Sequence, residues 1–391
     1  MDWGGAQVLF FGLMKEAKKF GEVIAVLPEG SNSHLLKFLD NLGVSCQFVD
    51  SHTDGKPALK LKRKLERHRN KIKSEYAFIR YLNKLDLKNS IIHTEFAPWQ
   101  SFTALYFLSL KAPVFVTMHN SLPENLKWRS VLWRIKFRLL MSSKNFYLFT
   151  ANQDTKNSLK YLISQKYIDR VKIIYANIDP DEIEDAMSLK LNRQDICSQY
   201  NLPENKFYIF CVGQFIDRKG RWVFLEAANK LLKSNKDLMF VWISNSKPDL
   251  EDLEKVKTYG LGENFSLITS DQVGNEHIDL FKLMRLADVF TLPSYVEGLP
   301  ISIIEAMALG LPTISTDINA IPEAVKHLET GILIKPGSSD ELVNSIQMLK
   351  DDENLREQIS EKGREYVLEK FNQKKVVKIA VESYIEAFNN K

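Results

Sequence analysis

Short apolar runs rich in β-branched and aromatic residues alternate with helix-period segments along the whole chain. This alternation is typical of parallel β-sheets covered by helices on both faces. The runs form two consecutive sets, and 391 residues suffice for two domains of about 150–200 residues each. The sequence therefore predicts an α/β protein built from two similar lobes.

The boundaries of the lobes follow from the order of these runs. A Pro-containing acidic stretch, Asn177–Asp185, separates the two sets. We therefore predict an N-terminal lobe at 1–176, a C-terminal lobe at 177–371 and a final helix at 372–391. The predicted strands are Val23–Leu27, Cys46–Val49, Ile91–His93, Val114–Thr117, Phe146–Thr150, Val171–Ile174, Phe207–Val212, Met239–Ile243, Phe265–Ile268, Val289–Leu292 and Thr313–Ser315. The predicted helices include Gly5–Lys19, Asp154–Ser164, Trp222–Leu232, Ile278–Leu286, Ile301–Leu309 and most of the tail from Asp340.

The two parts of the chain differ in charge. Residues 1–176 contain 28 Lys/Arg and 14 Asp/Glu, whereas the remainder contains 25 and 35, although the whole chain has a net charge of only +4. A basic lobe indicates an anionic partner, such as a lipid surface, a phosphorylated acceptor or a nucleic acid. The alternative is a solvated basic surface without a partner.

Two segments of the basic lobe have the pattern of amphipathic helices. Residues 56–80 hold ten Lys/Arg and two acidic residues, and their apolar stripe is Leu61, Leu65, Ile72, Tyr76 and Ile79. Residues 127–140 carry the stripe Trp128, Leu132, Ile135 and Leu139 between flanking Lys and Arg. Such helices can lie in a membrane interface, and the alternative is a core-facing stripe under a solvated basic face. Nucleic-acid binding is disfavoured because 56–80 lacks an interleaved aromatic platform.

The most informative segment is Leu292–Pro312, in which a predicted strand runs into a Pro/Gly loop and then a helix. In open α/β sheets ligands bind at the carboxyl ends of strands, and free amides at a helix start favour an anion. Gly298 lets the chain approach a phosphate or sugar closely. Pro300 suits the first helical turn because it has no amide hydrogen.

Two carboxylates lie in this segment. Glu297 follows the strand beside the positive end of the helix, where it can accept hydrogen bonds from sugar hydroxyls. Glu305 lies on an otherwise apolar helix face, where an unpaired carboxylate is costly, and holding two ribose hydroxyls would explain it. The alternatives are a helix-capping role for Glu297 and a surface position for Glu305.

Several classes of protein are disfavoured by what the sequence lacks. The three cysteines, Cys46, Cys197 and Cys211, are not at metal-ligand spacing and are predicted to be buried thiols in a reducing compartment. The chain has no apolar run of 18 residues and does not begin with a secretory signal, so we predict a cytoplasmic protein. An NAD-dependent dehydrogenase is disfavoured because no Gly-x-Gly-x-x-Gly follows a first strand.

The Leu292–Pro312 segment closely resembles the acidic Glu-x7-Glu motif of glycosyltransferase family 4, a large family of retaining enzymes with the GT-B fold. Other parts of the chain resemble further motifs of that family: Val212–Gly220 with its Lys-Gly ending, Ile318–Glu323, Thr330–Pro336, Val116–His119 and Gly4-Gly5. The resemblance covers nearly the whole chain and is most specific in residues 206–336.

The resemblance implies a role for each matching residue. Lys219 and Arg218 would neutralise the leaving diphosphate of a UDP-, GDP- or ADP-linked sugar. Glu297 would orient the sugar with the help of the amides of Gly298 and Leu299. Glu305 and Pro300 would belong to the donor site, with Glu305 on the ribose. His119 would lie near the reaction centre, and Gly4 and Gly5 near the phosphates.

The family also implies two Rossmann-like domains, a last helix that crosses back to the N-terminal domain, and no metal ion or other cofactor. The acceptor would be a saccharide or a lipid-linked molecule, reached on the inner face of the membrane. Some positions depart from the family pattern: the first strand before Gly4 is missing, Gln214 replaces a frequent arginine and Ala320 a frequent glycine. These departures leave a second hypothesis open, a GT-B pseudoenzyme that binds nucleotide-sugar without turnover.

Overall fold

The structure is a computed structural model that describes residues 5–31, 33–49, 60–122, 129–274 and 276–390. The chain divides into two compact units. The N-terminal unit consists of Phe10–Ile174 with Val377–Lys391, and the C-terminal unit consists of Met1–Leu9 with Tyr175–Val376. Each unit has its own hydrophobic core.

The C-terminal unit is built on a six-stranded parallel sheet with the strand order β12-β11-β10-β7-β8-β9. Its strands are β7 (Phe207–Val212), β8 (Leu238–Ser244), β9 (Phe265–Thr269), β10 (Val289–Leu292), β11 (Thr313–Thr316) and β12 (Ile332–Ile334). The chain moves outward from β7 to β9 and then returns to the other side of β7 for β10. Because the order reverses there, the carboxyl ends of β7 and β10 form the topological switch point at which such sheets bind ligands.

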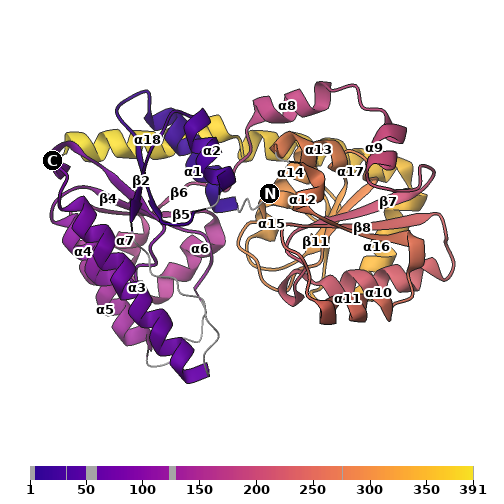
Figure 1. Cartoon of the computed structure of the whole chain (residues 1–391), viewed down its shortest axis with the longest axis horizontal. Coiled ribbons are helices and arrows are strands. Elements are labelled where there is room, and N and C mark those ends of the chain that lie inside the picture. Colours follow the sequence, from indigo (N-terminus) through magenta and orange to yellow (C-terminus); the bar gives the residue numbers. More distant parts are fainter. Residues whose placement is uncertain (1–4, 32, 50–59, 123–128, 275, 391) are drawn as a thin grey trace. The chain divides into compact units, whose positions relative to one another are not determined.

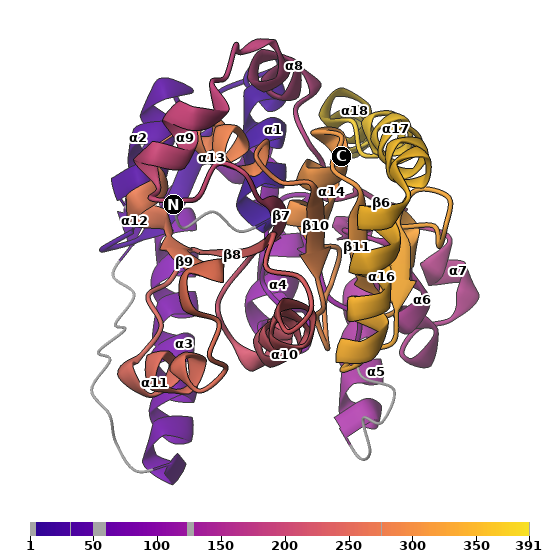
Figure 2. The same cartoon turned by 90° about the vertical axis from the view of Figure 1, so that its right-hand side faces the viewer.

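Helices cover both faces of this sheet (Figures 1 and 2). On one face lie α10 (Arg221–Leu232), α11 (Leu250–Lys257) and α16 (Ser339–Asp351), and on the other lie α13 (His277–Met284), α14 (Ile301–Ala308) and α17 (Glu353–Lys370). The shorter elements and the two helices that precede the sheet are α8 (Pro180–Ser188), α9 (Arg193–Gln199), η3 (Asp217–Lys219), η4 (Gly262–Asn264), α12 (Ser270–Val273) and α15 (Ile321–Ala324).

The N-terminal unit contains a four-stranded parallel sheet, β3-β4-β5-β6, and a separate parallel pair, β1-β2. The strands are β1 (Ile24–Pro28), β2 (Ser45–Val49), β3 (Ile92–Thr94), β4 (Val114–Met118), β5 (Phe146–Thr150) and β6 (Lys172–Ile173). The helices are α1 (Gly5–Ala17), α2 (Ser33–Asn41), α3 (Lys60–Leu82), η1 (Leu87–Asn89), α4 (Phe102–Ser109), α5 (Arg129–Ser142), α6 (Gln153–Ser158), η2 (Leu159–Tyr161), α7 (Gln165–Ile168) and α18 (Gln373–Asn389).

The last helix, α18, joins the N-terminal unit through a partly buried polar contact. The hydroxyl of Tyr384 pairs with Nδ1 of His93 in β3, and Nε2 of His93 lies 2.7 Å from the Thr117 hydroxyl in β4. Tyr384 also meets the ring of Phe115 edge to face, with the ring centres 4.8 Å apart. Burial, helped by the charge of His119, lowers the pKa of His93 to about 3, so this imidazole is neutral.

The predicted strands all occur, with ends shifted by no more than two residues, and two details of the prediction are wrong. β12 was not predicted, because its three residues are too short a run to stand out after Thr330-Gly331. The single helix predicted at Asp154–Ser164 ends at Ser158 and continues as η2. The Ser158 hydroxyl accepts the Leu122 amide and donates to the Thr155 carbonyl, and such local bonds compete with helix continuation.

Both basic amphipathic segments are helical where the structure describes them, as α3 and α5. On α5 the stripe residues Leu132, Ile135 and Leu139 are 47%, 53% and 43% exposed, so the core-facing alternative is wrong for them. On α3, Ile72 and Tyr76 are exposed as well. Residues 56–59, 127 and 128 lie outside the described residues, as do the side chains of Leu61 and Leu65.

Candidate functional site in the C-terminal unit

Two loops meet at the switch point of the C-terminal sheet. The loop after β7 runs through η3 to Gly220, and the loop after β10 runs from Pro293 to Pro300. They are joined by the amide of Tyr295, which donates to the carbonyl of Arg218 at 2.8 Å. Gly220 has φ +76°, and a Cβ there would lie 1.9 Å from the Pro293 carbonyl oxygen. Only glycine therefore permits this close approach of the loops.

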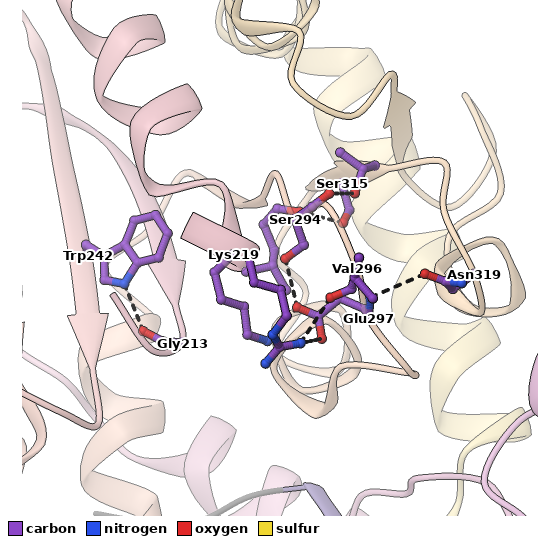
Figure 3. A network of polar contacts seen from close by, with 11 residues as sticks. Gly213, Lys219, Trp242, Ser294, Val296, Glu297, Ser315 and Asn319 are labelled. Carbon is purple, nitrogen blue, oxygen red and sulfur yellow. Dashed lines mark hydrogen bonds and ion pairs between the residues drawn. The ribbon is translucent and has the colours of Figure 1, made fainter. Parts of the chain in front are cut away.

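Glu297 lies at the centre of this junction beside Lys219 (Figure 3). Its side chain is buried, and its carboxylate lies 2.6 Å from Lys219 Nζ and 3.3 Å from Arg218 Nη1. The Ser294 hydroxyl donates to Oε1 at 2.8 Å. The structure thus brings together three of the predicted site residues, and two cations sit against one carboxylate.

The polypeptide after Glu297 offers unpaired donors. Within the described part of the chain, the backbone amides of Gly298 and Leu299 have no hydrogen-bond partner. Pro300 is the N-cap of α14 with φ −67° and ψ 122°, so it lies just before the helix rather than in its first turn. Glu297 is therefore not a capping residue, and the amides beside it are available to an anion.

Glu305 lies in the second turn of α14 and is only 3% exposed, so the surface alternative is wrong. Its Oε1 lies 3.1 Å from Nε2 of His277, the first residue of α13. Glu305 thus belongs to a different polar contact from that of Glu297.

The remaining predicted site residues come from other parts of the chain. His119 follows β4 in the N-terminal unit, where its Nε2 lies 2.8 Å from Glu95 Oε1. Gly5 begins α1, and Gly4 lies outside the described residues.

No group of three or more His, Cys, Asp or Glu side chains suited to a metal ion occurs among the described residues. Asp179 and Asp181 form an Asp-x-Asp sequence, but each has another role. Asp179 accepts the amide of Asp181 at the start of α8, and Asp181 pairs with Lys374 Nζ at 2.7 Å.

Sequence reasoning missed three polar residues around the two carboxylates. Ser294 and His277 contact Glu297 and Glu305 directly, and the Asn319 side chain accepts the Glu297 amide at 3.4 Å. Ser294 lay inside the recognised motif and could have been found there. Asn319 has φ +46°, a conformation that asparagine tolerates, so its place between β11 and α15 carried a weak signal. His277 had none, because its partners are 95 and 28 residues away in the chain.

Comparison with known proteins finds relatives among glycosyltransferases. Residues 192–366 match the family model described as Glycosyl transferases group 1. An alpha-D-kanosaminyltransferase from Streptomyces kanamyceticus is 28% identical over 187 residues, which are 48% of this chain and 47% of that protein. The UDP-Gal:alpha-D-GlcNAc-diphosphoundecaprenol alpha-1,3-galactosyltransferase of Escherichia coli is 27% identical over 281 residues, 70% of this chain and 69% of that one. The chain thus aligns with about half to two thirds of the length of these relatives.

The fold has matches among solved structures. The Anabaena protein HepE, solved in complex with UDP-glucose, superposes with a TM-score of 0.74 over 98% of this chain and 97% of its own, at 15% identity. That likeness concerns the fold, whereas the sequence match covers the unit that holds the Lys219–Glu297 junction. Residues 192–366 are thus similar to the glycosyl transferases group 1 family, and the chain has the GT-B fold.

Proposed function

We propose that this protein is a retaining glycosyltransferase that transfers a sugar from a nucleotide-sugar to a saccharide or lipid-linked acceptor, without a metal ion. The observation that carries the proposal is the junction of Lys219, Arg218 and Glu297 beside the amides of Gly298 and Leu299. Two cations and two unpaired amides suit a diphosphate, and the carboxylate suits the hydroxyls of a sugar.

The chemistry follows from exchanging partners at this junction. When a donor binds, its diphosphate would take Lys219 and Arg218 from Glu297, whose carboxylate would then accept hydrogen bonds from the sugar. The cations and amides stabilise the charge that grows on the diphosphate as the glycosidic bond breaks, so no metal is needed for it. Retention would follow from attack on the same face, with the departing phosphate taking the acceptor proton.

The relatives support the donor and acceptor classes. The name of the Escherichia coli relative gives a UDP-sugar as donor and a diphosphoundecaprenol-linked sugar as acceptor, and HepE was solved with UDP-glucose. By analogy, we propose a UDP-sugar as the first donor to test and a lipid-linked saccharide as the acceptor.

The test is hydrolysis and transfer from a panel of UDP-, GDP- and ADP-sugars, comparing the wild type with Lys219→Met and Glu297→Gln. We expect one donor to be turned over and each variant to lose about 100-fold or more in kcat, the usual cost of removing a transition-state contact. Lys230→Met is the matched control, because Lys230 pairs with Glu226 and Asp340 in the same unit but away from both loops. Nucleotide binding without turnover of any donor would instead identify a pseudoenzyme.

We also propose that the exposed stripe of α5 contacts an anionic membrane. Leu132, Ile135 and Leu139 face solvent, and the exposed Arg138 lies about one turn from Ile135. No helix of the described residues is long and apolar enough to cross a bilayer. Contact would therefore be interfacial, with apolar side chains inserted and cations near the lipid phosphates.

Sedimentation with vesicles tests this contact. We expect binding to vesicles containing phosphatidylglycerol, weaker binding at high salt, and a clear loss in Leu132→Ser/Ile135→Ser. Leu250→Ser, which removes an exposed leucine of the C-terminal unit, is the control. Binding that is the same in all three proteins would contradict the proposal.

A further inference from the structure

Glu305 has one carboxylate oxygen held by the protein. Its Oε1 faces His277 Nε2 at 3.1 Å. Within the described residues no donor or cation pairs with Oε2. The side chain is nonetheless 3% exposed, on a helix whose residues Ser302–Ala308 are all buried. Oε2 can therefore accept hydrogen bonds from a ligand.

His277 is itself held from its other side. Its Nδ1 lies 2.9 Å from Glu182 Oε1, in α8, and its ring packs on Phe281 with the ring centres 4.3 Å apart. An imidazole that faces carboxylates with both nitrogens donates from both, so it is a cation. Burial alone lowers the pKa of His277, but the charges of Glu305 and Glu182 and the hydrogen bonds to them raise it to about 10.

We infer that His277 is a positioning residue which, anchored by Glu182, orients Glu305 so that Oε2 meets the ribose hydroxyls of a nucleoside diphosphate. This inference rests on the proposed function and on the expectation, from the family resemblance, that Glu305 binds the ribose of the donor. A ring bonded at both nitrogens cannot turn without breaking a charge-assisted hydrogen bond. The orientation of Glu305 is therefore set before the nucleotide binds, and the site favours nucleotides that carry both ribose hydroxyls.

A second contact between the same helices provides a matched control. Arg285, the C-cap residue of α13, donates through Nη1 to the carbonyls of Ala186 and Leu189, at 2.6 and 3.0 Å. Like His277, it ties α13 to the α8 segment, but it does not contact Glu305. A variant at Arg285 therefore loosens the helix pair without touching the proposed ribose contact.

The test is a cycle that pairs a protein change with a ligand change. Dissociation constants of UDP and 2′,3′-dideoxy-UDP are measured by calorimetry for the wild type, His277→Gln, Glu182→Gln and Arg285→Met. In the wild type the missing hydroxyls should cost about 10–100-fold in affinity, the range of hydrogen bonds to a charged group. We expect the preference for UDP over 2′,3′-dideoxy-UDP to fall to less than about threefold in His277→Gln, and to an intermediate value in Glu182→Gln. Arg285→Met should keep it.

The outcomes separate this inference from the proposed function. If His277→Gln weakens both ligands equally, or if Arg285→Met loses the preference as fully as His277→Gln does, His277 is only structural and the inference is overturned. Should His277→Gln fail to fold, Glu182→Gln decides the question by the same ratio. If the wild type binds none of UDP, GDP and ADP, the proposed function fails and the inference falls with it.

Discussion

At the scale of single residues, the C-terminal site depends on two loops that approach each other without space for a side chain. Gly220 has φ +76°, and its Cα faces the carbonyl of Pro293. The loop after β7 carries Arg218 and Lys219, and the loop after β10 carries Glu297. The distance between the cations and the carboxylate is thus set by the absence of a side chain at residue 220.

We expect Gly220→Ala to be far more costly than Gly260→Ala. Both glycines have positive φ, at +76° and +63°, which costs alanine about 1–2 kcal/mol, but only Gly220 has atoms within 4 Å of a new Cβ. The clash with Pro293 should add roughly 1–3 kcal/mol and weaken nucleotide binding. Urea unfolding and calorimetric titration measure the two effects, and equal losses in both variants would contradict the prediction.

A second prediction at this scale concerns the buried carboxylate of Glu297. Lys219→Met should lower the free energy of unfolding by about 2 kcal/mol, because a buried carboxylate loses its nearest cation. Adding Glu297→Gln should restore much of that stability while activity stays low. Urea unfolding tests this prediction. A double variant less stable than Lys219→Met would show that the unpaired Glu297 carboxylate does not explain the loss of stability in Lys219→Met.

At the scale of elements, a partly buried histidine in each unit links a helix to its neighbours. His93 joins α18 to β3 and β4 as a neutral ring, whereas His277 joins α13 to α8 and α14 as a cation. The difference has a plain cause. His93 faces hydroxyl groups and aromatic rings, and His277 faces two carboxylates.

His93 should make the N-terminal unit sensitive to acid. Its pKa is about 3 in the folded protein against an ordinary value of 6.5, so the unfolded chain binds the proton first. Stability from this residue is complete above pH 6.5 and falls with decreasing pH, by at most about 1.4 kcal/mol per pH unit. Hydrogen exchange in β4 and β5 between pH 7 and 4 measures the slope. The slope of stability against pH should flatten in His93→Gln. It should persist in His327→Gln, which replaces an exposed histidine of the other unit.

At the scale of the whole molecule, the two units should respond to pH in opposite directions. The pKa of His277 is raised to about 10 from 6.5, so the folded C-terminal unit holds a proton that the unfolded chain releases. The contribution of His277 to the free energy of unfolding is complete below pH 6.5 and is lost as the pH rises towards 10. Hydrogen exchange in β8 should therefore quicken at high pH relative to its intrinsic rate, and His277→Gln should remove that dependence. Equal pH slopes in the wild type and this variant would contradict the assignment.

Much of this architecture could be predicted from the sequence. The residue ranges predicted for β7 and β10 agree with the structure to the residue, because short apolar runs between turn residues define buried parallel strands locally. Lys219 and Glu297 could be singled out because each lies in a continuous motif after such a strand. The short edge strand β12 could not be predicted because a three-residue run does not stand out, and the break after Ser158 could not because the Ser158 hydroxyl also accepts the amide of the distant Leu122.

What the sequence by itself determined is which residues form strands, which loops follow them and which polar side chains those loops carry. Hydrophobic period and turn residues act over a few positions, so they can be read along the chain. Only the tertiary structure decided that Lys219 and Arg218 close on Glu297, and that Glu305 is held by His277 and Glu182. Those contacts follow from placing β7 beside β10 and α8 beside α13, and such pairings depend on how distant segments bury their apolar faces together.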